Sequence, residues 1–289
     1  MTQARTEPIL ELRAFETIAT GLDHPEGIAL GPDGRVYAGG EAGQIYAVSE
    51  DGTIDELAST GGFMFGIALD AEGDIYACDF GRAQIARISA SGTVSTYSTG
   101  TEQRPMRVPN FCAFDDDGNL YVTDSGGWGN DDGLVFIVAP DGTTRVWSES
   151  VPRFPNGCCL TASGDELLVV ESAARRVARL TIGDDGSAGS PETVVDLSGS
   201  QPDGIALAVD GTMFVGCYRP DRLWRIEPDG RASILAEDPD GVVLNQPANV
   251  AFVGPGLDRL AVSSLGGWNL VGANVGAIGL PLRRPKPGG

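Results

Sequence analysis

The 289-residue sequence is almost without lysine and histidine, since Lys286 is its only lysine and His24 its only histidine. Its 40 acidic residues outnumber its 20 basic ones and give a formal net charge of −20. Phosphate binding depends on clustered Lys and Arg, so a nucleic-acid partner is disfavoured. A zinc site, which prefers nitrogen and sulfur ligands, is disfavoured too. Any Ser-His or Cys-His nucleophile would have to use His24.

Paired cysteines and long apolar runs are also missing. The five cysteines form an odd set without paired spacing, which argues against a disulfide framework. Cys112 and Cys158 occupy repeat positions that hold Ile or Val elsewhere, so we expect them in the core. The sequence contains no run of about 18 apolar residues, the length that a membrane-spanning helix needs. The first residues show no signal-peptide pattern. We therefore expect a cytoplasmic protein without a membrane partner; no long apolar element suggests an oligomeric state.

What the sequence does contain is a repeat, in which a short loop runs into an apolar strand. The repeat occurs six times, with equivalent positions at 26, 65, 110, 156, 203 and 248, so that successive copies lie 39 to 47 residues apart. Turns such as Pro32-Asp33-Gly34 and Asp117-Gly118 join the short strands of each copy. A period of this length, rich in short strands, is typical of β-propeller blades.

The repeat predicts an all-β fold, a six-bladed β-propeller of four-stranded blades. The sixth copy has room for three strands only, the last expected around residues 275–280. Residues 15–19 resemble a fourth strand, which would complete the sixth blade and close the ring. We expect a single domain over residues 1–289 with a core of about 15–282. Residues 1–10 and 283–289 are expected to be loose ends.

One position of the repeated loop points to a metal site, because equivalent inner-strand positions converge on the axis of a propeller. Four of the six copies carry an oxygen-bearing side chain there, and the other two carry Phe65 and Ala248; the four are Glu26, Asn110, Asn156 and Asp203. Carboxylate and amide oxygens are the ligands of Ca²⁺, with Mg²⁺ or Mn²⁺ as alternatives, and four protein ligands leave positions open for water or substrate. Turn preference explains the Asn and Asp residues singly, but it does not explain Glu26.

The loops between second and third strands are expected at the same end of the propeller and would surround the metal. Phe65, Trp128 and Trp268 make this predicted entrance apolar, and Tyr218 and Arg107 lie in or near the same loops. We treat these five as candidate substrate-binding residues. The two tryptophans could equally fill gaps between blades. A second acidic series could orient substrate or brace the loops that follow it, and bracing is favoured; it comprises Asp79, Asp124 and Glu171.

The motifs at these positions resemble the SMP-30/gluconolactonase/luciferin-regenerating family of six-bladed propellers over about residues 15–282. They are His24-Pro25-Glu26-Gly27, Pro109-Asn110, Pro155-Asn156-Gly157, Pro202-Asp203-Gly204-Ile205-Ala206 and the strand 118–124. The resemblance implies a catalytic divalent metal, usually calcium, held by Glu26, Asn156 and Asp203. Asn110 would bind the metal or contact substrate through it, and Asp203 would also be a general base or nucleophile.

The resemblance implies hydrolysis of a lactone or ester, but the sequence departs from the sugar-lactonase pattern. Members that bind sugars carry an arginine two residues before the third-blade asparagine, where this chain has Val108. The apolar entrance would leave the hydroxyls of a sugar poorly paired. We therefore predict a small-molecule substrate more apolar than a simple sugar lactone. The alternatives are a metal-dependent lyase or isomerase and a non-catalytic ligand-binding propeller.

Overall fold

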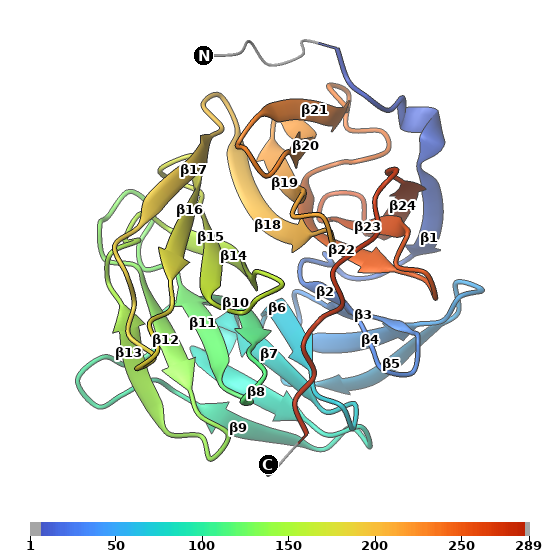
Figure 1. Ribbon diagram of the computed structural model, residues 1–289. Coiled ribbons are helices and arrows are strands. Elements are labelled where there is room, and N and C mark those ends of the chain that lie inside the picture. The colour runs from blue at the N-terminus through green and yellow to red at the C-terminus, as the bar shows by residue number, and fades with distance from the viewer. Residues whose placement is uncertain (1–6, 287–289) are drawn as a thin grey trace.

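The structure is a computed structural model that describes residues 7–286. Its strands form six four-stranded antiparallel sheets, and the inner strands β2, β6, β10, β14, β18 and β22 contact one another in a closed ring. Figure 1 shows the six sheets arranged as blades around a central axis. This arrangement confirms the predicted six-bladed β-propeller. None of the helices between residues 7 and 286 is long and apolar enough to cross a membrane.

The blades follow one another along the chain, each with its innermost strand first. Blade one holds β2 (Ile28–Leu30), β3 (Val36–Gly39), β4 (Gln44–Val48) and β5 (Ile54–Ser59). Blade two holds β6 (Met64–Leu69), β7 (Ile75–Asp79), β8 (Gln84–Ile88) and β9 (Val94–Ser98), with the short 3-10 helix η2 (Phe80–Arg82) after β7. Blade three holds β10 (Pro109–Phe114), β11 (Leu120–Asp124), β12 (Leu134–Val138) and β13 (Thr144–Ser148).

The remaining blades repeat this plan, except that the last one takes its outer strand from the N-terminus. Blade four holds β14 (Pro155–Leu160), β15 (Glu166–Glu171), β16 (Arg176–Thr181) and β17 (Glu192–Asp196). Blade five holds β18 (Gln201–Leu207), β19 (Met213–Arg219), β20 (Asp221–Ile226) and β21 (Ala232–Glu237). Blade six holds β22 (Pro247–Val253), β23 (Arg259–Ser264), β24 (Asn269–Asn274) and β1 (Glu16–Thr20), which follows the 3-10 helix η1 (Leu12–Ala14).

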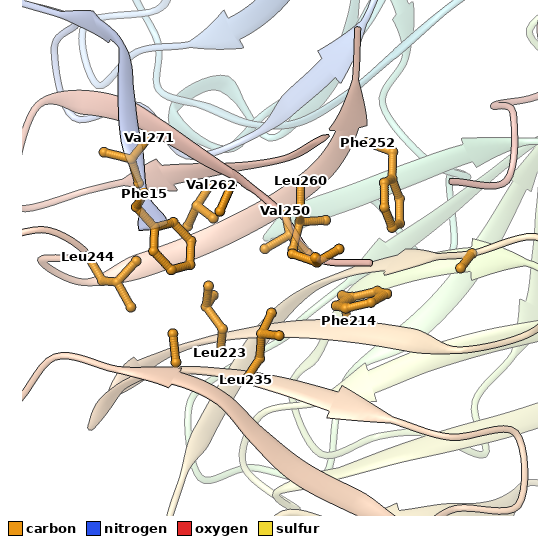
Figure 2. Close-up of a cluster of buried hydrophobic side chains, with 14 residues drawn as sticks. Phe15, Phe214, Leu223, Leu235, Leu244, Val250, Phe252, Leu260, Val262 and Val271 are labelled. Atoms are coloured by element: carbon orange, nitrogen blue, oxygen red, sulfur yellow. The ribbon is translucent and has the colours of Figure 1, made fainter. Parts of the chain in front are cut away.

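The N-terminal strand closes the ring as predicted. β1 pairs antiparallel with β24, and Glu16 lies opposite Gly272. Figure 2 shows Phe15, just before β1, packed with Val250, Leu260 and other apolar side chains between blades five and six. In the same cluster the rings of Phe214 and Phe252 meet edge to face with centroids 5.4 Å apart. Closure thus gives the backbone groups at the edge of β24 hydrogen-bond partners, and it buries an apolar interface at the same time.

The last strand of blade six lies earlier than expected. β24 ends at Asn274, and the prediction of a strand around residues 275–280 is wrong. The turn after β23 is very tight: Gly267 N–H donates to the Ser264 carbonyl, and Trp268 has a positive φ of 54°. The third strand therefore starts at once, at Asn269. Residues 275–280 instead leave the blade and reach blade five, where Val209 N–H donates to the Ile278 carbonyl at 2.9 Å.

The expected loose ends are attached to the propeller where the structure describes them. Ile9 N–H and Leu10 N–H donate to the carbonyls of Ile234 and Leu235 in β21. At the other end, Ala71 N–H donates to the Pro285 carbonyl at 3.0 Å. Both tails form hydrogen bonds with backbone groups at blade edges or turns. The composition of the tails, rich in polar residues and proline, does not predict these contacts. Residues 1–6 and 287–289, also expected to be loose, lie outside the described part of the chain.

The five cysteines are free thiols, as their spacing predicted. Cys112 and Cys158 are buried in the core clusters around blades three and four. Burial raises the pKa of the Cys158 thiol well above its ordinary value. A thiol held neutral in this way packs as a small apolar side chain, which confirms the interpretation of these residues as core.

Candidate functional site

The four predicted axial residues lie at or just before the starts of the inner strands of blades one, three, four and five. All four are buried: Glu26, Asn110, Asn156 and Asp203 have exposed fractions of 2 to 6%. The neighbouring strands approach closely here because the next position is glycine in four blades. A Cβ added to Gly66 would lie 2.8 Å from the Asn110 carbonyl oxygen, and one added to Gly157 would lie 2.7 Å from that of Asp203. The glycines therefore allow the axial residues to converge.

Two serines fix the direction of the asparagine amides. Asn110 Nδ2 donates to Ser125 Oγ at 2.9 Å, and that hydroxyl donates to the Pro155 carbonyl at 2.7 Å. Asn156 Nδ2 donates in the same way to Ser172 Oγ at 3.2 Å, and Ser172 donates to a carbonyl of the next blade. Each amide nitrogen is thereby occupied, so each amide oxygen is turned away from the serine.

The oxygens at the axis lack hydrogen-bond partners within residues 7–286. Asn110 Oδ1, Asn156 Oδ1 and Asp203 Oδ1 are all buried without one. A buried oxygen without a partner costs free energy, on the order of 1–3 kcal/mol for a neutral group. Three such atoms on adjacent blades, together with a buried glutamate, form an oxygen-rich set. This donor set fits a hard divalent cation, which would supply the missing partner to each oxygen.

The two axial carboxyl groups also indicate a place for positive charge. Burial and the charge of Asp203 raise the pKa of Glu26 well above its ordinary value. Burial raises the pKa of Asp203 to about 7, although the neighbouring Asn156 amide opposes the rise. Two carboxylates held close together in a low-dielectric environment repel one another, and a bound dication would relieve both the repulsion and the desolvation.

Asn249 belongs to this region and was missed by the sequence analysis. It lies one position after Ala248 in β22 and is 1% exposed. Both Oδ1 and Nδ2 of its side chain are buried without a hydrogen-bond partner among the described residues. The side chain packs over Gly204, the residue after Asp203. The sequence did contain a signal for Asn249: it is an asparagine at a repeat position that holds glycine in four copies and Phe111 in another.

An aromatic cluster lies on blade two beside the axial residues. Phe65 stacks on Phe80 with ring centroids 4.9 Å apart and an angle of 5° between the rings, and it meets Phe63 edge to face at 4.9 Å. Phe80 comes from η2, in the loop between the second and third strands. This contact brings the loop to the first-strand end of the blade, as the topology predicts. The result is an apolar wall at the position where four of the other five blades present oxygens.

The other four candidate substrate-binding residues take different positions around this end. Tyr218 is half-buried, and burial together with the charges of Asp203 and Glu26 raises its pKa. Trp128 packs edge to face on Phe154, and Trp268 lies tilted against His24 with ring centroids 4.7 Å apart. The two tryptophans are about half exposed, at 51% and 49%. The guanidinium of Arg107 is exposed and paired with Asp132, with Nη1 to Oδ2 at 2.6 Å.

The second acidic series braces the loops that lead to the axial residues. Asp124 accepts hydrogen bonds from the N–H groups of Arg107 and Val108 before β10, and from Gly126 after β11. Glu171 accepts one from Arg153 N–H, before β14. Asp79 accepts from Phe63 N–H, before β6, and from Arg82 N–H, after β7. Bracing is thus observed, and it extends to the preceding loop as well as the following one.

A six-bladed propeller with four buried oxygen-bearing side chains around its axis is the class that this geometry defines. The sequence model of the SMP-30/gluconolactonase/LRE-like region matches residues 89–266, more than half of the chain. The chain therefore belongs to this family, in agreement with the resemblance seen in its motifs. A model of the strictosidine synthase-like N-terminal region matches residues 11–54.

Individual proteins that are similar to this chain are distant in sequence. The protein strictosidine synthase-like 3 of Arabidopsis thaliana is 28% identical over 170 residues, 53% of this chain and 43% of its own length. A gluconolactonase from Xanthomonas campestris matches with a TM-score of 0.78 at 20% identity, over 90% of this chain and 89% of its own. Regucalcin from Agrobacterium tumefaciens, described as a calcium-binding protein, gives 0.71 at 17% identity, over 92% and 98% of the two chains. These structures share the fold.

Proposed function

We propose that the protein is a divalent-metal-dependent hydrolase that opens a lactone or a related ester. The observation that carries this proposal is the set of buried axial oxygens without hydrogen-bond partners among residues 7–286, on Asn110, Asn156 and Asp203. Family membership supports it, as do structural neighbours named as a gluconolactonase and a calcium-binding protein. Calcium is the first candidate because the donors are all oxygen, and Mg²⁺ or Mn²⁺ are the alternatives.

The metal would be held by Glu26, Asn110, Asn156 and Asp203. When bound, such a cation polarises a substrate carbonyl and stabilises the negative charge that develops on its oxygen. The asparagines contribute neutral oxygens whose direction is fixed by Ser125 and Ser172. Glu26 and Asp203 contribute negative charge from blades one and five, so that the four donors balance a dication.

Asp203 is the candidate general base. A carboxylate oxygen of Asp203 would accept the proton of the water that attacks the carbonyl carbon, and would return it to the leaving alkoxide. Its burial excludes bulk water from this proton transfer. Tyr218 is half-buried in β19, beside the strand that carries Asp203, and can donate a hydrogen bond to the substrate.

The aromatic cluster on blade two supports a substrate with an apolar substituent. Phe63, Phe65 and Phe80 offer stacked and edge-to-face ring surfaces next to the axis. Trp128 and Trp268 add half-exposed aromatic surface in the loops of blades three and six. A sugar lactone would place hydroxyl groups against these rings without partners, which costs affinity. An alkyl or aryl lactone or ester would bury apolar area there instead.

Metal analysis with thermal melting tests the proposal first. We expect one calcium per chain, a lower melting temperature after chelation, and recovery on addition of calcium. Glu26→Ala should lose both the metal and the hydrolysis of aryl and alkyl lactones. Full activity in a metal-free Glu26→Ala protein would contradict the proposal, and so would a wild-type protein that neither contains nor responds to a divalent cation.

An elimination or isomerisation at the same site is the alternative within enzymes, since one propeller site can serve varied chemistry. Hydrolysis must incorporate one oxygen from water into the product. Turnover in ¹⁸O-labelled water followed by mass spectrometry separates the two reactions, because an unlabelled product would exclude hydrolysis.

A further inference from the structure

A cavity of about 890 Å³ lies in the channel at the end of the propeller opposite to the axial site. It is lined by the later residues of the six inner strands, by the turns that follow them in blades one and six, and by residues 280–284. Small residues occupy the position three after the axial one in every blade: Ala29, Ala68, Ala113, Cys159, Ala206 and Ala251. Because these side chains are short, the channel stays open. Its size is typical of a small-molecule binding site.

The channel is a compartment separate from the axial site. The four axial residues are not among those that line it. In four blades the glycine that follows the axial residue does not line the cavity either, so the lining begins two residues beyond the axial position. Phe111 packs against Gly66 and also lines the cavity. A ligand in the channel would therefore not contact the axial oxygens.

The C-terminal segment crosses the mouth of the channel. In Figure 1 it runs in dark red over the centre of the ring. Leu280 N–H donates to the Leu207 carbonyl of blade five at 2.8 Å. Arg283 then reaches the Thr161 carbonyl after blade four's inner strand, and Arg284 reaches the Leu30 carbonyl of blade one, with Nη2 to oxygen at 2.7 Å. The segment covers the cavity and places an arginine on it.

Arg284 is a half-buried cation that lines the cavity, with the charge of Asp33 nearby. Its Nε is buried and has no hydrogen-bond partner within residues 7–286. Among the same residues it takes part in none of the ion pairs, whereas other arginines at the mouth do: Arg35 with Asp33, Arg259 with Glu16 and Arg283 with Asp116. Burial lowers the pKa of Arg284. The exposed carboxylates at the mouth, Glu50 and Asp258, are left to water.

We propose that this channel binds an amphipathic monocarboxylic acid with an unbranched apolar tail. The tail would lie along the ring of small side chains, and the carboxylate would accept hydrogen bonds from Arg284. A guanidinium that lines the cavity and takes part in no ion pair within residues 7–286 offers a carboxylate a charge-assisted pair, which neutral ligands cannot form. The inner-strand side chains that line the channel are all apolar, so the hydroxyl or amide groups of a polar tail would have no side-chain partners along them.

Titration calorimetry with dodecanoate, below its micelle concentration, tests this site. We expect one dodecanoate per chain, binding at least tenfold tighter than dodecanol. Arg284→Met should weaken dodecanoate at least tenfold and leave dodecanol unchanged. Ala206→Phe, which fills the channel, should remove both; Ala113→Leu is the second channel-filling variant should Ala206→Phe fail to fold.

Two control variants separate this site from other parts of the molecule. Arg231→Met removes an exposed arginine paired with Asp229 and should leave dodecanoate binding unchanged. Asp203→Asn alters only the axial site and should leave it unchanged as well, so the outcome is independent of the proposed hydrolysis. The proposal is overturned if wild-type protein does not bind dodecanoate, or if Arg284→Met and both channel-filling variants bind it as wild type does.

Discussion

At the scale of the residue, the candidate site depends on which atom of each asparagine faces the axis. An amide presents either oxygen or nitrogen, and only the oxygen can bind a cation. Ser125 and Ser172 decide this, because each hydroxyl accepts from the amide nitrogen while donating to a carbonyl of the next blade. Removal of a side chain that orients a metal ligand in this way commonly weakens metal affinity by roughly 10- to 100-fold.

Ser125→Ala and Ser172→Ala are therefore expected to weaken binding of the metal about tenfold each, without unfolding the protein. Calorimetric titration of chelator-stripped protein with calcium measures the effect directly. Ser125→Thr keeps a hydroxyl and should restore most of the affinity. Ser91→Ala, on an exposed turn, is the matched control. Unchanged calcium affinity in both alanine variants would show that the serines do not orient the amides.

At the scale of the element, buried acids at the ends of second strands hold the loops that carry the axial residues. Asp124 shows this most clearly, because it accepts Arg107 N–H at 2.7 Å, Val108 N–H at 3.1 Å and Gly126 N–H at 3.2 Å. It is 4% exposed. The loop before β10 has no regular hydrogen-bond ladder of its own here, so these three bonds replace one.

Asp124→Asn should lower the free energy of unfolding by about 2 kcal/mol, because one side-chain oxygen becomes an amide that cannot accept from a buried N–H. Urea denaturation followed by fluorescence measures the change. The comparison is Asp141→Asn, an exposed turn residue that accepts a single bond from Thr143 N–H, which should cost much less. Equal effects of the two substitutions would show that Asp124 does not brace the loop.

At the scale of the whole molecule, the ring brings acidic groups from distant parts of the sequence to one axis in a protein that is already strongly acidic. Glu26 and Asp203 come from blades one and five, and neither has a basic ion-pair partner among residues 7–286. Their raised pKa values follow from this shared burial. The fold therefore holds charge at its centre at a cost to stability unless a cation is bound.

The metal-free protein should consequently lose stability as the pH rises. The native pKa of Asp203 is raised to about 7 from an ordinary value of 3.8, so its contribution is fully present below pH 3.8 and is lost as the pH rises through 7. The expected loss is on the order of a few kcal/mol. Melting of chelated protein across this range measures it. Asp203→Asn should flatten the dependence, and saturating calcium should oppose it; a chelated wild type as stable at pH 7.5 as at pH 4.5 would contradict this.

The sequence by itself determined the number of blades, the closing strand and the residues on the axis. It could do so because each blade repeats one local pattern, and because oxygen-bearing side chains stand out where a repeat otherwise holds Phe65 or Ala248. Local turn chemistry and alternation specify strands of this kind without reference to distant residues.

Only the tertiary structure decided what depends on contacts between blades. Ser125 and Ser172 are unremarkable in sequence, and their importance follows from the carbonyls of the next blade that accept their hydrogen bonds. The course of residues 275–285 was mispredicted for the same reason, because their partners lie in blades one, two, four and five. A side chain or segment whose partners lie in other blades leaves no periodic signal, so its role follows only once the ring has closed.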